Sequence, residues 1–487
     1  MENLSEGLLD FKTLEKTIFR TMCQVACQLI RQYLQVCDRV IMARRDAKEY
    51  RCIGRRATTI KTLMGEVAYE RYYYKKRSGG YVFLLDEAMG IHGGSGLVSE
   101  NLAEQIVIEC TDKSFRKAAG SISSLTGQAV SAMGAWGVLK RFGEKLEGQE
   151  ARLEELDSKG ITGQLGGIKC PVLFSEMDDV CISTQKEKRA KKGNPPEGGR
   201  KKSGNRLLHI GTAYTGWAEK KDGSHRTLDK IAYASLGDAA GFTSTFEALL
   251  RQRFDMDGIS SRVMNGDGAS WVKVAAEDSD SILQLDPYHR SRAITRAVSG
   301  SEDRKALYEA FKEKNTAKAL GHIYELIGKE QEDGARNRLG ELFEYFHSNR
   351  DNLLTWSERD IELPAPPAGV SYRGLGVQES SNTMLTQRMK HRKGSWSING
   401  ANHMAKILCF RHTIGLDAIL GVFPEPPAAG DQTPPLSAAK APLYDGKGYD
   451  GGWLHAEMPF EQAFLTSGRK AIMGLLRQRP ISDLSFI

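Results

Sequence analysis

Three acidic residues stand where the strands or helices of a folded domain would begin or end. Asp178 lies within a strand-like run, FSEMDDV; Asp267 stands between Gly266 and Gly268 in NGDGA; and Glu379 opens a helical segment in VQESSN. Mg²⁺ prefers hard oxygen ligands and keeps several waters, so one or two carboxylates per ion suffice. Two ions about 4 Å apart can activate an attacking hydroxyl and stabilise the leaving oxygen of a phosphodiester. The acids therefore predict a catalytic site for two Mg²⁺ or Mn²⁺ ions, which the flanking glycines would let a phosphate approach closely.

Each of these acids also has a simpler interpretation. Asp-Gly is a common turn dipeptide, so Asp267 could serve only to shape a turn. An acid in the first turn of a helix, such as Glu379, could serve only the helix dipole. Because adjacent strand residues point to opposite faces, either Asp178 or Asp179 could be the first carboxylate, and Glu176 shares the face of Asp178.

A histidine follows the last strand-like run of this region. The segment LDPYHR places Asp286 and His289 just beyond that run. The two residues could be a strand-end cap and a structural histidine. In the catalytic interpretation, His289 would lie beside the scissile phosphate or a leaving oxygen.

Basic residues are concentrated on both sides of the predicted site. One run, QKEKRAKKGNPPEGGRKKSGNR, supplies Lys188, Arg189, Lys191, Lys192, Lys201 and Lys202. A second, RMKHRKGSW, supplies Arg388, Lys390, Arg392 and Lys393. A charge run is commonly a solvated loop, but here it could neutralise the phosphates of DNA. Trp396 could stack on an unpaired base.

The order of predicted elements indicates a multidomain α+β protein. Three strand-like runs from residue 170 onward are followed by alternating helix and strand, which favours a mixed sheet flanked by helices. This is the order expected of a ribonuclease-H-like catalytic domain, formed by residues 165–300 and 365–412. Residues 301–364 are strongly helical and charged, and predict an all-helical insertion.

The N-terminal third precedes this domain with three further regions. Residues 1–50 predict one long helix that could pack within its domain or dimerise with a second copy. Residues 51–100 predict a β-hairpin, in which VAYERYYY and YVFLLD are strands and KKRSGG is a basic tip. Residues 101–150 predict a helix-turn-helix DNA-binding domain around LTGQ, although an ordinary helical hairpin fits the same pattern. Residues 423–452 are rich in Pro, Gly and Ala and indicate a flexible linker before a C-terminal tail, 453–487.

Composition limits the class of protein. The chain has 487 residues, is 40% hydrophobic and carries a net charge of +7. No apolar run approaches the roughly 20 residues of a membrane span, and no secretory signal opens the chain. The eight cysteines form no C-x-x-C pair, which favours small core residues over a zinc site. We expect a cytoplasmic protein without membrane partners.

Four segments in this order resemble a known family. SEMDDV, NGDGASWVK, LDPYHRSRAI and QESSNTMLTQRMKHRKGSWS are similar to motifs of the DDE transposases of prokaryotic insertion sequences, specifically the ISLre-type family and its Mutator-like relatives. The resemblance covers roughly residues 50 to 412. It implies the triad Asp178, Asp267 and Glu379 and a helical insertion before Glu379. Mutator-like relatives often carry C-x-x-H where this chain has D-P-Y-H.

The resemblance also implies an activity and partners. These are metal-dependent cleavage at the ends of an insertion sequence and attack of the freed 3′-hydroxyl on target DNA, without a covalent protein–DNA intermediate. The implied partner is double-stranded DNA with terminal inverted repeats, held by a homodimer or higher homo-oligomer. A ribonuclease-H-like nuclease without strand transfer, or a catalytically inactive DNA-binding protein derived from a transposase, are the alternatives.

Overall fold

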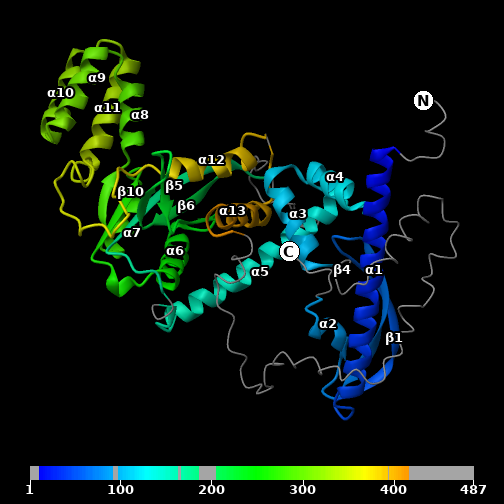
Figure 1. The fold of residues 1–487 in the computed structure, drawn as a ribbon. Coiled ribbons are helices and arrows are strands. Elements are labelled where there is room, and N and C mark those ends of the chain that lie inside the picture. Colours follow the sequence, from blue (N-terminus) through cyan, green and yellow to red (C-terminus); the bar gives the residue numbers. More distant parts are fainter. Residues whose placement is uncertain (1–9, 92–96, 163–165, 186–203, 393, 416–487) are drawn as a thin grey trace, which may run out of the picture. The chain divides into compact units, whose positions relative to one another are not determined.

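The computed structural model describes residues 10–91, 97–162, 166–185, 204–392 and 394–415, and its ribbon is drawn in Figure 1. The chain divides into two compact units. Unit 1 contains the described residues up to Gln105 together with Gly120–Val130, and unit 2 contains Ile106–Ala119 and the described residues from Ser131 onward. The predicted linker 423–452 and the predicted tail 453–487 lie outside the described residues.

Unit 1 combines a long helix with a small sheet. Helix α1 (Phe11–Arg44) begins at Asp10, whose side chain accepts from the Thr13 N–H at 3.0 Å. The sheet has the order β3-β2-β1-β4, with strands β1 (Tyr50–Lys61), β2 (Glu66–Lys76), β3 (Tyr81–Val82) and β4 (Leu97–Val98). Leu34 of α1 packs with Ile60, Val67 and Tyr69 of the sheet in one buried cluster.

The predicted hairpin is only partly correct. β2 and β3 do pair as antiparallel strands around the basic tip, but β3 has two residues and YVFLLD continues into helix α2 (Leu84–Ala88). The longer ribbon joins β2 to β1, a strand that the sequence did not single out. The reason lies in tertiary packing. A helical turn places Leu85, which is fully buried, in the core that packs on the sheet.

Three helices follow β4: α3 (Glu100–Asp112), α4 (Phe115–Thr126) and α5 (Ala132–Ser158). Gly127 lies between α4 and α5 with φ +69°, a conformation that favours glycine. α5 is 27 residues long, and within unit 2 it packs on α13 (Ile398–Thr413), where a Cβ on Gly143 would lie 2.1 Å from His403. One face of α5 is therefore already covered by protein, and DNA binding by this region stays a prediction.

Unit 2 is built on a mixed five-stranded sheet with the order β11-β10-β5-β6-β9. Its strands are β5 (Val172–Ser183), β6 (Asn205–Tyr214), β9 (Ile231–Ser235), β10 (Ser261–Gly266) and β11 (Ile282–Leu285). β6 is antiparallel to β5 and β9, whereas β5, β10 and β11 are mutually parallel. A separate two-stranded ribbon joins β7 (Gly216–Glu219) and β8 (His225–Leu228). The predicted mixed sheet is confirmed.

Helices cover both faces of this sheet. On β6, Thr212 Oγ1 donates to Ser381 Oγ of α12 (Gln378–Met389) at 3.1 Å, whereas the adjacent Gly211 packs against Phe246 of α6 (Ala239–Arg253). Adjacent strand residues point to opposite faces, so α12 and α6 lie on opposite sides, as Figure 1 shows. α7 (Ser270–Asp278) packs beside α6, and α13 packs along β9.

The segment predicted as a helical insertion contains helices and no strand between residues 301 and 364, all of which the structure describes. After α8 (Pro287–Ala297) come α9 (Ser301–Lys312), α10 (Thr316–Lys329) and α11 (Asp333–Ser348). Buried Leu307, Phe311, Ile323 and Phe346 share one core with Leu285 at the end of β11. Among the described residues, no helix has the length and apolar character needed to cross a membrane.

Candidate active site

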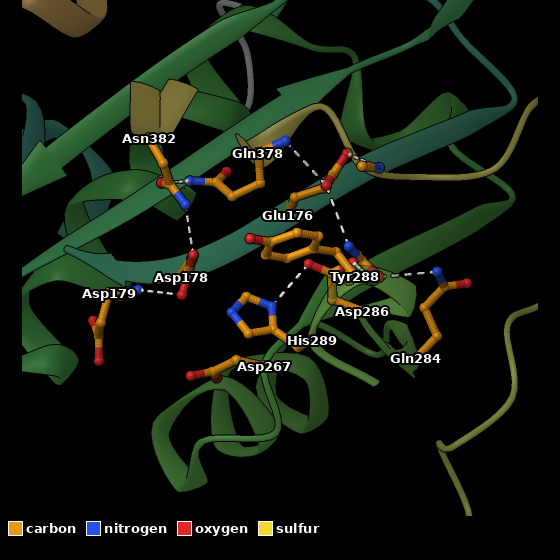
Figure 2. Close-up of polar contacts among 12 residues, drawn as sticks. Glu176, Asp178, Asp179, Asp267, Gln284, Asp286, Tyr288, His289, Gln378 and Asn382 are labelled. Carbon is orange, nitrogen blue, oxygen red and sulfur yellow. Dashed lines mark hydrogen bonds and ion pairs between the residues drawn. The ribbon is translucent and has the colours of Figure 1, made fainter. Parts of the chain in front are cut away.

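The parallel register aligns three acids at one edge of the sheet. Asp178 of β5 is level with the residues that directly follow β10 and β11, which are Asp267 and Asp286. The carboxyl ends of parallel strands are where open sheets commonly bind ligands. Figure 2 shows the three side chains together with His289 and residues from the start of α12.

Asp178 is a buried carboxylate with few partners. Its residue is 8% exposed; Oδ1 accepts from the Asp179 N–H at 2.7 Å, and Oδ2 accepts from Asn382 Nδ2 at 2.6 Å. Burial raises the pKa of Asp178 to about 6, although the Asp179 N–H and His289 counteract the shift. A cation bound beside Asp178 would stabilise its ionised form, because the positive charge would replace the missing solvation.

Asp178, His289 and Glu379 form a group that could hold a metal ion. One potential ligand atom from each residue lies within 4.8 Å of the other two. Asp286 accepts from the N-terminus of α8 through the Tyr288 N–H, and its Oδ2 lies 2.9 Å from His289 Nδ1. Metal-binding histidines commonly use one ring nitrogen for the ion and the other for a carboxylate. The bond to Asp286 also raises the pKa of His289.

Asp267 lies beside this group but is not one of its three members. Its Oδ1 accepts from the Ala269 N–H at 2.9 Å, and its carbonyl oxygen accepts from Tyr345 Oη at 2.7 Å. Figure 2 shows its carboxylate next to His289. Asp267 therefore shapes the turn after β10, as its simpler interpretation predicts, and also contributes negative charge to the site.

The glycines around Asp267 have reasons that differ from the predicted one. A Cβ on Gly266 would lie 2.5 Å from Val272 Cγ1. Gly268 has φ +86°, and a Cβ on it would lie 2.7 Å from Asn349 Oδ1. Close packing and backbone conformation therefore require both glycines. Close approach of a phosphate to this backbone stays a prediction, because these contacts concern only the Cβ side of each glycine.

Glu176, two residues before Asp178 on the same face, is saturated with donors. It is fully buried, and it accepts from Tyr214 Oη at 2.6 Å. Its two carboxylate oxygens also accept three backbone N–H groups at the start of α12, from Gly376, Val377 and Gln378, at 3.1, 2.9 and 3.2 Å. Glu176 is thus an anchor for the helix that carries Glu379 rather than a vacant metal ligand.

A ladder of side-chain amides extends from Glu176 across the parallel strands. Asn265 Nδ2 donates to Glu176 Oε2 at 3.2 Å, and Gln284 Nε2 donates to Asn265 Oδ1 at 3.0 Å. Gln284 Oε1 in turn accepts from the Trp356 N–H at 3.0 Å. All three ladder side chains are buried, so the row of acids above them rests on a fixed polar layer.

The sequence-based prediction missed two residues of α12. Gln378 Nε2 donates to Asn382 Oδ1 at 3.0 Å and so orients the Asn382 amide. Asn382 Nδ2 in turn donates to Asp178 Oδ2. The spacing of four residues puts both amides on one helical face, on either side of Glu379. That spacing was the only local signal, and it places the two amides side by side without indicating their partner Asp178.

The opposite face of β5 explains the choice between Asp178 and Asp179. Asp179 Oδ1 lies 2.6 Å from His209 Nδ1, and Asp179 Oδ2 accepts from Trp271 Nε1 at 3.2 Å. His209 comes from β6 and Trp271 from α7. Asp179 is therefore held away from His289 and Glu379, and Asp178 is the acid that faces them.

The basic residues fall into three groups. Lys188, Arg189, Lys191, Lys192, Lys201, Lys202 and Lys393 lie outside the described residues. Lys390 and Arg392 are exposed. Arg388 and Trp396 correct the prediction, since both are buried.

The burial of Arg388 and Trp396 has a clear cause in unit 2. Arg388 Nε donates to the Cys110 carbonyl at 2.8 Å, and its guanidinium lies 4.9 Å from the centre of the Trp396 ring. Trp396 Nε1 donates to the Met389 carbonyl at 3.0 Å. Burial lowers the pKa of Arg388 to about 10. Neither side chain is available for a phosphate or a base in this structure.

Comparison with known proteins gives two kinds of likeness. A UPF0236 protein of Caldanaerobacter subterraneus subsp. tengcongensis, whose name joins eleven loci, is 21% identical over 414 residues, covering 84% of this chain and 79% of the relative. The UPF0236 protein in the vanSb 3′ region of Streptococcus gallolyticus is 24% identical over 408 residues, covering 81% of each.

Among solved structures, a match was found to a chain of the "Crystal structure of a pre-cleavage Mos1 transpososome". The match covers 52% of this chain and 78% of that chain, at 10% identity and a TM-score of 0.12. At that TM-score the likeness carries no argument about the fold. The model of an uncharacterised protein family matches residues 4–418. The chain therefore belongs to the UPF0236 family.

Proposed function

We propose that this protein is a DDE transposase that cleaves DNA at the ends of an insertion sequence and joins the freed end to target DNA. One observation carries the proposal: Asp178, His289 and Glu379, from three elements far apart in the sequence, bring ligand atoms within 4.8 Å of one another. A buried carboxylate beside a second carboxylate and an imidazole is costly without a cation, which makes a structural role alone a weaker explanation.

The fold supports this reading. The sheet starts with three antiparallel strands and continues with parallel strands β10 and β11 on the other side of β5. We infer that it is a ribonuclease-H-like sheet, which matches the order predicted from the sequence. In that interpretation the first carboxylate comes from the central strand, the second follows the fourth strand and the third comes from a helix after the insertion.

The donor set fits a hard divalent cation. Two carboxylates suit Mg²⁺ and Mn²⁺, and the imidazole is better suited to Mn²⁺. Asp178 and Glu379 would hold the ion together with His289, and Asp267 would be needed for the predicted second ion. When bound, such ions would activate a water or hydroxyl and stabilise charge on a phosphodiester.

The chain's own residues have the task of orientation. Asn382 holds one oxygen of Asp178, so its second oxygen keeps a fixed direction. Asp286 holds His289 Nδ1 and leaves Nε2 for the site. Glu176 fixes the first residues of α12 and thereby the position of Glu379. Preorganisation of this kind lowers the reorganisation needed at the moment of reaction.

The partners follow from the same proposal. Exposed Lys390 and Arg392 follow directly on α12 and could contact the phosphates of double-stranded DNA. The name of one relative joins eleven loci, and a protein encoded many times in one genome is in keeping with the proposed mobile element. Two DNA ends call for a homodimer or higher assembly, acting in the cytoplasm.

The test uses the full chain, Mg²⁺ or Mn²⁺, and DNA fragments with the sequences that flank its gene. We expect Asp178→Asn and Asp267→Asn to lose cleavage at least roughly a thousandfold, since a metal ligand contributes several kcal/mol to the transition state. The matched control is Asp179→Asn, which should cleave within a few-fold of the parent.

The products separate the alternatives. Cleavage with strand transfer supports a transposase, whereas cleavage without joining supports a nuclease. DNA binding without cleavage by the parent chain would indicate an inactive DNA-binding protein. Equal loss in Asp178→Asn and Asp179→Asn would reject the site as described.

A further inference from the structure

Helix α1 has two apolar faces, and the described residues of unit 1 cover one of them. Over its C-terminal half, Ile30, Leu34 and Ile41 pack on β1 and β2 in the core of unit 1. Asp38 lies on this face as well, buried, and accepts from the Tyr72 N–H at 2.9 Å. This face accounts for the docking of α1 on its sheet.

The second face carries a continuous exposed stripe. Its large side chains are 41–61% exposed: Ile18, Met22, Leu29, Tyr33, Val36 and Val40. At about 100° per residue these six positions fall within an arc of about 60°. Phe11, 78% exposed, extends the stripe toward the start of the helix. Single exposed apolar residues are ordinary, but an aligned row of this length marks an interaction surface.

The spacing of the stripe is symmetric about Leu29. If a second α1 lies antiparallel with a two-fold axis at Leu29, Ile18 of one copy faces Val40 of the other, and Met22 faces Val36. Half-buried Val25 then faces Tyr33, and Leu29 faces itself. A two-fold interface requires such a self-complementary surface. Within this arc, no large apolar residue between Ile18 and Val40 is left opposite a polar one. Phe19, 52% exposed, lies outside the arc, and in this pairing it is opposite Arg39.

The charges around the stripe fit the same arrangement. Lys16, Arg20 and Arg31 are exposed on the other side of the helix, so like charges do not meet across the pair. Glu15 lies within the arc of the stripe, and the antiparallel pairing brings it beside Arg44 of the second copy. DNA would require cations within the stripe, which contains none. A second copy is therefore the occupant that the surface favours.

The area of the stripe fits a weak dimer. From Glu15 to Arg44 the helix is about 45 Å long and about 10 Å wide. Pairing two copies thus covers roughly 900 Å² in total, just under the about 1,000 Å² of a stable interface and in the range of weak ones. We propose that the protein forms a homodimer through antiparallel pairing of α1 helices about Leu29.

Sedimentation of the full chain without DNA or metal tests this proposal, so its outcome is independent of the proposed catalysis. We expect a dimer over the micromolar range. Leu29→Glu should weaken dimerisation at least roughly 100-fold, because it buries two like charges at the axis. Leu29 is 55% exposed within one copy, so the variant should keep the parent's helical content and thermal unfolding.

Two further variants sharpen the test. Gln24→Glu adds the same charge at an exposed position off the stripe and should leave the dimer intact. Ile18→Glu should weaken the dimer, and adding Val40→Lys in the same chain should restore it, since these positions face each other only in the antiparallel register. A monomeric parent, or a Leu29→Glu chain that dimerises like the parent, would overturn the proposal. Failure of the Val40→Lys rescue would overturn the register.

Discussion

The two faces of β5 hold neighbouring acids in opposite situations. On one face, Asp179 has a partner for each oxygen, His209 and the Trp271 indole. On the other face, Asp178 has one side-chain donor, Asn382, and otherwise looks toward His289 and a second carboxylate. The residues are adjacent in sequence and chemically identical, so only their surroundings distinguish a structural acid from a candidate ligand.

Glu176 extends this comparison within a single face. It is more deeply buried than Asp178, yet five donors compensate for its charge. Burial alone therefore does not identify the functional acid. What identifies Asp178 is burial combined with too few donors, which is the condition that raises the pKa of a carboxyl group.

The largest effect that tests this comparison should come from Glu176→Gln. The amide keeps the shape of the side chain but removes the charge that binds three backbone N–H groups, those of Gly376, Val377 and Gln378, where α12 begins. We expect a loss of about 3 kcal/mol in the free energy of unfolding, because hydrogen bonds to a buried charge are strong. Cleavage should fall about 10- to 100-fold, and half-maximal cleavage should need a higher metal concentration, because Glu379 is no longer held in place.

Urea unfolding followed by tryptophan fluorescence measures this stability, because five of the six tryptophans belong to unit 2. The metal concentration that gives half-maximal cleavage separates positioning from simple loss of fold, since a purely structural defect would lower the active fraction without changing it. An unchanged metal requirement would mean that Glu176 supports the fold alone.

A change in stability of similar size but opposite sign should come from Asp178→Asn in the absence of metal. The pKa of Asp178 is about 6 in the folded protein, against an ordinary 3.8. Between these values the folded chain holds a proton that the unfolded chain has released, so stability falls as pH rises through this window. The variant should thus be more stable than the parent at pH 7 by about 3 kcal/mol, and nearly equal to it near pH 4.

The matched variant on the other face should behave in the opposite way. Asp179→Asn loses charge-assisted bonds to His209 and Trp271 and should be less stable than the parent by about 1 kcal/mol. Urea unfolding in a chelator at several pH values compares the two. If both variants are destabilised at pH 7, the two acids have the same structural role and the comparison fails.

Sequence patterns located the acids of this site better than its supports. Asp178, Glu379 and His289 were accessible because strand ends, a helix start and residue chemistry are local features. Gln378 and Asn382 were missed because their value depends on a partner, Asp178, some two hundred residues away. No local pattern reports such a partner.

The same limit explains the errors about exposure. Arg388 and Trp396 belong to a basic run, which predicts exposed side chains. Both are covered by Cys110 and Phe115, which lie nearly three hundred residues earlier in the chain. The glycines around Asp267 likewise depend on Asn349 and Val272, which are distant or on another element. The mixed sheet was predictable because the succession of strands and helices along the chain is a local feature, whereas burial of single side chains follows tertiary packing.

The last effect concerns the metal and narrows the difference in stability between the parent and Asp178→Asn. A cation that binds the folded state adds stability according to its concentration relative to Kd, about 1.4 kcal/mol at ten times Kd. Mg²⁺ or Mn²⁺ should therefore stabilise the parent and Asp179→Asn by this amount, and Asp178→Asn by almost nothing. Adding metal thus narrows the gap between the parent and Asp178→Asn, because the ion supplies the positive charge that Asp178 lacks. Equal stabilisation of all three chains would place the cation elsewhere on the protein, and Asp178 would then be a buried acid without a metal.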